Sequence, residues 1–131
     1  MTIEIPPKNW TPFFLKLNSR RDALVDVRVE ASGDMRLVAK GAPLQSVTFD
    51  VGDACNSALT IEFGPAGSHW QHCIIEPIHV ILRKESEGDH YNLLEIPAES
   101  GMTAIIIHPG ISPAMLEELD LPQLPEPTPA Q

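Results

Sequence analysis

The sequence is poor in basic residues. Nine lysines and arginines stand against 18 aspartates and glutamates, so the formal net charge is −9. A protein that binds a nucleic-acid backbone needs a concentrated positive surface. A small basic group remains at Lys16, Arg20, Arg21 and Arg28, but acidic residues lie close to it. The charge therefore disfavours nucleic acid as a partner.

Cysteine and long apolar runs are also scarce. Cys55 and Cys73 are too few for a disulfide framework, and no run approaches the roughly 18 apolar residues of a spanning helix. The first residues lack the positive and apolar segments of a signal peptide. We therefore expect a cytoplasmic protein with reduced thiols and no membrane partner. A bridge between the two cysteines stays open, because both could lie on neighbouring strands.

The motifs of several common enzyme classes are missing. The sequence has no Walker-type loop, no G-x-G-x-x-G and no G-x-S-x-G. These absences exclude the usual nucleotide-binding and hydrolase classes. We accordingly expect no cofactor and assign no catalytic residue.

An aromatic stripe near the N-terminus predicts one amphipathic helix. Its apolar residues recur at i, i+3, i+4 and i+7, at Trp10, Phe13, Phe14 and Leu17. Pro12 is tolerated in a first helical turn. The helix should run from about Asn9 or Thr11 to about Arg20, with its aromatic face toward the core.

Period-2 or continuous apolar patterns predict strands in the rest of the chain. They lie at residues 24–30, 35–40, 47–51, 59–63, 68–85, 91–96 and 102–108. The turn cluster at 31–34 joins the first two into a hairpin, and Gly41–Pro43 should end the second. Pro77 should bend the stretch 68–85 into two segments. Residues 104–107 are apolar on both faces, so we expect cover on both sides, with the helix on one of them.

Together these elements predict an α+β fold over residues 1–110. The N-terminal helix packs on a curved, mostly antiparallel sheet of about six or seven strands, with partial closure into a barrel as a variant. Ser112 and Pro113 form an N-cap and N1 pair, which predicts a short C-terminal helix within 111–120. The Pro-rich residues 121–131 should form a disordered tail.

Spaced single residues from the N-terminus to the last strand have a recognisable order. They are Ile5-Pro6, Trp10, Phe13-Phe14, Ser19-Arg20, Pro43-Leu44, His69-Trp70-Gln71-His72, Pro77, Leu94-Glu95-Ile96 and Thr103. This order resembles a family of short bacterial proteins classed as a domain of unknown function, over about residues 3–108. The resemblance implies a bacterial cytoplasmic protein. It implies no activity, substrate or catalytic residue.

The stretch 68–85 holds the candidates for chemistry. His69 and His72 are weak metal candidates, because residues three apart on a strand face opposite sides unless a bulge intervenes. Cys73 as a nucleophile would need His79 or His108 as its base. The alternative for Cys73 is a small buried hydrophobe.

A binding surface is the other interpretation of this region. Amphipathic side chains gather near the Gly-rich loop at 64–67, and they are His69, Trp70, His72 and Tyr91. A core position is the alternative for Trp70. The sequence thus favours a non-enzymatic module that binds a protein or a small molecule, with a homodimer suggested by the apolar last strand. The alternative function is a small metal-dependent or thiol enzyme using His69, His72 and Cys73.

Overall fold

The computed structural model describes residues 2–19, 23–51, 57–65, 70–84 and 90–117. Its elements are β1 (Thr2–Glu4), η1 (Pro7–Asn9), α1 (Trp10–Asn18), β2 (Leu24–Ala31), β3 (Asp34–Val51), β4 (Ser57–Phe63), β5 (Trp70–Ile75), β6 (Ile81–Arg83), β7 (Tyr91–Ala98), β8 (Gly101–Ile111) and α2 (Pro113–Glu117). The strands of this described part form one eight-stranded sheet in the order β1-β6-β7-β8-β2-β3-β4-β5. Every neighbouring pair is antiparallel.

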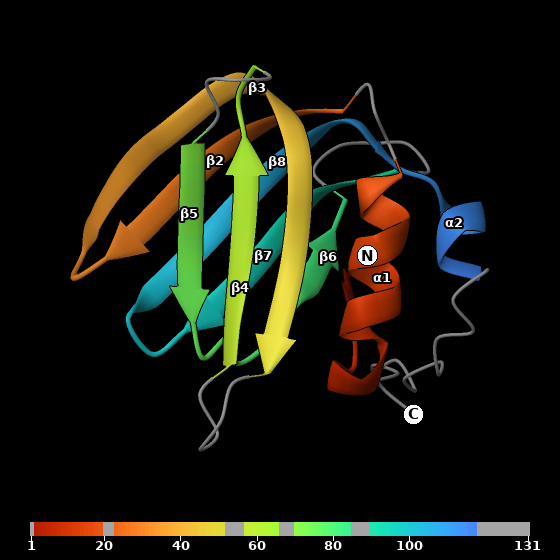
Figure 1. The fold of residues 1–131 in the computed structure, drawn as a ribbon, viewed down its shortest axis with the longest axis horizontal. Helices are drawn as coiled ribbons and strands as arrows, with labels where there is room; N and C mark the ends of the chain where they lie inside the picture. Colours follow the sequence, from red (N-terminus) through yellow and green to blue (C-terminus); the bar gives the residue numbers. More distant parts are fainter. Residues whose placement is uncertain (1, 20–22, 52–56, 66–69, 85–89, 118–131) are drawn as a thin grey trace, which may run out of the picture.

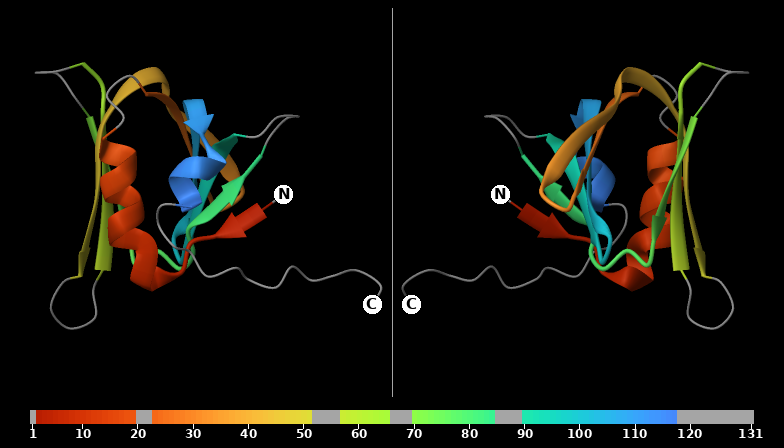
Figure 2. Two further views of the ribbon diagram at one scale, coloured as in Figure 1. Left: turned by 90° about the vertical axis from the view of Figure 1, so that its right-hand side faces the viewer. Right: turned by 90° about the vertical axis from the view of Figure 1, so that its left-hand side faces the viewer.

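The predicted fold class is confirmed, with eight strands where about six or seven were expected. The sheet curls but does not close. Its two halves face each other across the core, and α1 lies along one side of the space between them (Figure 1 and Figure 2). Among the described residues, no helix covers the opposite side of the sheet, beside β5 (Figure 1).

The long strand β3 joins the two halves of the sheet. Its residues 34–43 pair with β2, and its residues 44–51 pair with β4. The prediction that residues 41–43 end this strand is wrong, because the chain bends there and continues. Gly41 adopts φ of +61°, and its N–H donates to Asp26 Oδ1 at 2.6 Å. Glycine accepts this conformation at little steric cost, so the strand can change partners without a break.

The aromatic stripe of α1 fills the core, as predicted. Trp10, Phe13, Phe14 and Leu17 are all buried. The Trp10 Nε1–H donates to the Ile5 carbonyl at 2.7 Å, which gives the buried indole its polar partner. The helix begins and ends within two residues of the prediction.

The end of α1 takes the place of a missing strand. Once β3 leaves β2, one edge of its second half has no strand beside it in the described sheet. The Asn18 side chain lies there and bonds to both backbone groups of Val47. Its Nδ2 donates to the Val47 carbonyl at 2.9 Å, and its Oδ1 accepts from the Val47 N–H at 2.7 Å. One amide side chain therefore substitutes for a ladder partner.

The predicted bend at Pro77 is confirmed. β5 ends at Ile75, and Glu76 takes a positive φ of +52°. Pro77 makes an isolated bridge to Ala98, and β6 begins only at Ile81. The stretch that looked continuous in sequence is thus divided between the two halves of the sheet.

The cover of β8 differs in part from the expectation. Ile105 and Ile107 are buried in the core, and Ile106 is buried on the other face. However, the contacts of α1 with the sheet are concentrated on β3.

The Met115 N–H donates to Ser112 Oγ at 3.3 Å, which confirms the predicted cap of α2. The tail at 121–131 lies outside the described residues. Within the described part, no helix has the length and apolar character needed to cross a membrane.

Candidate functional site

A groove lies between β5 and the hairpin formed by β2 and β3. It has a volume of about 630 Å³. It is lined by Val29, Ala31, Asp34, Arg36, Leu37, Val38, Trp70 and His72. We call this hollow the β5 groove. The sheet does not close, and β5 and this hairpin lie on the side of the sheet away from α1 (Figure 1).

The walls of the β5 groove are apolar and accessible. Trp70 is 71% exposed, Leu37 54% and Val38 40%. The inner faces of the neighbouring strands bury their large side chains almost completely, as at Ile61 and Phe63. An apolar surface left open beside a well-packed core is typical of a binding site.

His72 forms the polar floor of the groove. It lies on β5 opposite Ile61, and its Nε2 is hydrogen-bonded to Thr103 Oγ1 on β8 at 3.2 Å. Thr103 is the buried polar side chain of the described core. Burial lowers the pKa of His72 below its usual 6.5. The imidazole is therefore neutral near pH 7 and can donate or accept a hydrogen bond.

Charged groups stand at the hairpin wall of the groove. Arg36 and Asp34 line it, and both are exposed. The Arg36 guanidinium can bind a carboxylate or another anion through bidentate hydrogen bonds. The groove thus combines an apolar wall, a neutral imidazole and a guanidinium within one hollow.

The structure brings together only part of the surface expected from the sequence. Trp70 and His72 both line the groove, whereas His69 lies outside the described residues. Tyr91 is 3% exposed. It sits on β7 opposite Ile111, with Lys84 Nζ 5.1 Å from its ring centre. Tyr91 therefore belongs to the core and not to the groove.

The arrangement around Cys73 does not assemble a thiol–imidazole pair on β5. Cys73 and His72 are adjacent on a strand, so their side chains face opposite sides of the sheet. The Cys73 thiol is free and exposed, 3.9 Å from Thr60 Oγ1. Cys55, its predicted alternative partner, lies outside the described residues.

The two other histidines named as bases have acidic neighbours elsewhere. His79 Nδ1 is 2.8 Å from Glu4 Oε2, and His108 Nε2 is 3.8 Å from Asp26 Oδ2. Among the described residues, no three histidine, cysteine, aspartate or glutamate side chains are grouped as metal ligands.

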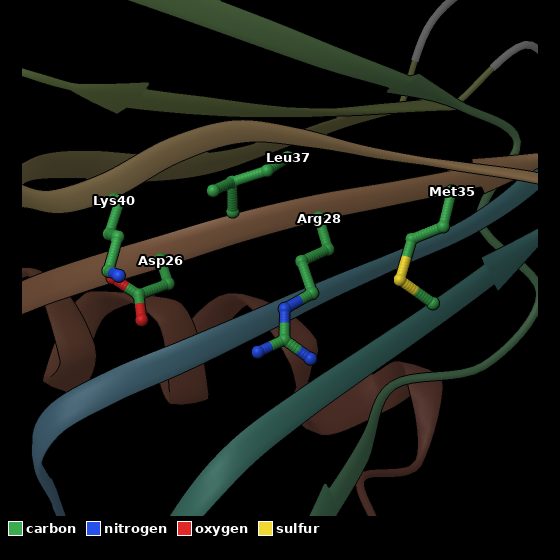
Figure 3. Close-up of a pocket in the computed structure, with 5 residues that line it drawn as sticks. All are labelled: Asp26, Arg28, Met35, Leu37 and Lys40. Carbon is green, nitrogen blue, oxygen red and sulfur yellow. The ribbon is translucent and has the colours of Figure 1, made fainter.

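A second, smaller hollow of about 260 Å³ lies on the other face of the same hairpin. Figure 3 shows the side chains that line it, which are Asp26, Arg28, Met35, Leu37 and Lys40. Asp26 and Lys40 lie at one end, Met35 at the other, and Arg28 between them (Figure 3). Asp26 already accepts the Gly41 N–H. This hollow offers less apolar wall and less space than the β5 groove.

The hairpin wall of the β5 groove carried no signal in the sequence. Val29, Arg36 and Val38 belong to an ordinary alternating pattern, and nothing local shows that they face Trp70. Comparison of the chain with protein-family models, curated proteins and solved structures gives no match. The geometry of the groove is therefore the basis for assigning a function.

Proposed function

We propose that this chain is a non-enzymatic binding protein whose ligand occupies the β5 groove. The observation that carries the proposal is the open apolar wall formed by Val38 and Trp70. The core of the same domain is closed and well packed, so this wall is not a consequence of poor packing. The resemblance to bacterial proteins of unknown function implies no activity, and it neither supports nor opposes this assignment.

The groove suits an apolar group that carries a polar or anionic end. Trp70 offers a flat surface, Arg36 a cation, and His72 a neutral hydrogen-bonding group. Covering the exposed part of a tryptophan side chain contributes roughly 3–4 kcal/mol before the cost of association, from its area and about 25 cal/mol per Å². That contribution alone corresponds to roughly two to three factors of ten in Kd.

Anilinonaphthalene sulfonate is a suitable probe, because it joins an apolar ring system to an anion. Its binding can be followed by dye fluorescence and by the emission of Trp70. The other tryptophan, Trp10, is 5% exposed and packs edge-on against Phe49 at 5.0 Å, so it should respond little. We expect saturable binding with one site per chain.

A pair of variants on one strand tests the location of the site. Val38→Asp places a negative charge in the groove wall, whereas Met35→Asp places the same charge in the outer hollow. We expect at least a tenfold loss of dye affinity for Val38→Asp and less than a twofold change for Met35→Asp. Equal effects of the two variants, or no saturable binding to the native protein, would overturn the assignment.

A further inference from the structure

We propose that the natural occupant of the β5 groove is an extended peptide segment that adds to β5 as a ninth strand. The inference rests on the proposed function, because it assigns a partner to the same groove. It goes further in naming the contact that holds the partner, which is the outer edge of β5, the last strand of the described sheet.

The alternation of hydrogen-bonded and non-bonded pairs between β5 and β4 shows which backbone groups of β5 face that edge. The Glu76 N–H donates to the Ser57 carbonyl at 2.7 Å, next to the Ile75–Ala58 pair of the ladder with β4. In an antiparallel ladder, bonded and non-bonded pairs alternate. Trp70, His72 and Ile74 therefore direct their backbone groups toward β4. The backbone groups of the alternate residues point away from the described sheet, at Gln71, Cys73 and Ile75.

The edge of β5 lacks the features that normally prevent strand addition. Its six residues, Trp-Gln-His-Cys-Ile-Ile, include no proline, no lysine and no acid, and its histidine is neutral at pH 7. The opposite edge of the sheet, β1, has only three residues, and Glu4 there is paired with His79. Natural sheets protect exposed edges with short strands and charges. By that comparison β1 is protected and β5 is open.

The position of the β2–β3 hairpin favours a single extended segment over a second copy of the chain. The β2–β3 hairpin reaches past the β5 edge and lies behind it, on the concave side (Figure 1 and Figure 2). A second copy of the chain that added its own β5 would bring its hairpin into the same space. A peptide of about six residues, roughly 20 Å long when extended, needs only the edge and the groove.

The chemistry of the segment follows from the two faces of an added strand. Alternate side chains would point into the groove, toward Val29, Val38 and Trp70, and should be small and apolar. The others would face solvent on the outer side of the sheet. Because the chain carries a net charge of −9, basic residues at these outward positions favour association.

The probe we would use is the peptide acetyl-Lys-Val-Lys-Val-Lys-Val-Lys-amide, titrated by calorimetry. Two derivatives of equal composition distinguish strand addition from simple apolar contact. One carries N-methyl groups on its first two valines and the other on its two inner lysines. In a strand, only one alternate set of N–H groups faces β5, so one derivative should lose at least tenfold in affinity and the other less than threefold. Loss at the lysines indicates an antiparallel strand, and loss at the valines a parallel one.

A matched pair of protein variants tests the edge directly. Gln71→Pro removes an outward N–H and leaves the bonds of β5 to β4, whereas Gln71→Ala removes the side chain and keeps that N–H. We expect at least tenfold weaker peptide binding for Gln71→Pro, with less than a threefold change for Gln71→Ala. Dye binding should persist in both.

Three results would overturn the inference. They are equal losses from the two N-methylated peptides, equal peptide affinities of the two Gln71 variants, and a stable dimer that covers the β5 edge. If the native protein binds the dye but not the peptide, the inference falls and the groove function stands. If it binds neither, both fall. Should Gln71→Pro not fold, the two N-methylated peptides still decide the question.

Discussion

Replacing Asn18 with alanine should destabilise the protein by removing the substitute strand partner of β3. The side chain makes two hydrogen bonds to Val47, at 2.9 and 2.7 Å, and both are partly buried. In Asn18→Ala the N–H and C=O of Val47 lose these partners at an edge that no strand covers in the described sheet. The helix itself should become slightly more stable, because alanine has a higher helical propensity than asparagine.

The size of the effect can be worked out from these bonds. Each hydrogen bond contributes about 1 kcal/mol net, and a backbone group left without a partner costs about 1–3 kcal/mol when fully buried. Water can reach part of this edge, so the lower end applies, and the two losses total roughly 2–2.5 kcal/mol. The propensity gain of about 0.5 kcal/mol leaves a net loss of roughly 1.5–2 kcal/mol. For a domain of this size Tm should fall by roughly 5–10 °C.

Urea denaturation measures this change as a lower midpoint at an unchanged m-value. Ser19→Ala is the control, because the Ser19 hydroxyl bonds only to the exposed Lys16 carbonyl; it should cost less than about 0.5 kcal/mol. Asn18→Asp should cost at least as much as Asn18→Ala, since a carboxylate then faces the Val47 carbonyl. If Asn18→Ala unfolds within 0.5 kcal/mol of the native protein, the substitute-partner explanation is wrong.

Two further predictions concern a glycine and a histidine. Gly101→Ala should cost more than about 2 kcal/mol, because φ is +148° and a Cβ would lie 2.2 Å from the Glu30 carbonyl oxygen. Gly33→Ala, at φ of +82° in open space, should cost only about 1–2 kcal/mol, and equal thermal shifts would contradict this. Because burial lowers the pKa of His72, the unfolded chain binds its proton at higher pH than the folded chain does. The stability contributed by His72 is therefore complete above about pH 6.5 and falls as pH drops toward the folded pKa. The free energy of unfolding should depend less on pH in His72→Gln than in the native protein. An NMR titration that gives His72 a folded-state pKa at or above 6.5 would refute this prediction.

Much of the local structure was determined by the sequence itself. The aromatic stripe of α1, the alternation of β2 and the Ser112 cap of α2 all depend on neighbours a few residues away. Helical period, strand period and capping chemistry are set by local backbone geometry. Pro77 likewise marked a break, because proline cannot take part in a continuous ladder.

The path of β3 was decided only by tertiary structure. The glycine and proline at 41–43 read locally as an end of the strand, but Ala23 and Asp26 supply partners on one side, and β4 on the other. Long-range pairing therefore overrode the local signal. The burial of Tyr91 was also decided by tertiary structure. The alternating pattern around Tyr91 shows which face of the strand its side chain lies on, but not which other elements cover that face.

The arrangement of the candidate site was likewise decided almost wholly by tertiary structure. Trp70 and His72 stood out in the sequence, because tryptophan and histidine are uncommon and chemically distinctive. The hairpin wall opposite them comes from residues more than thirty positions earlier, and Thr103 from about thirty positions later. Alternation determines which side chains share a face of a strand. Only the curvature of the sheet and the order of its strands determine which faces meet, and which strand lies at the edge of the described sheet.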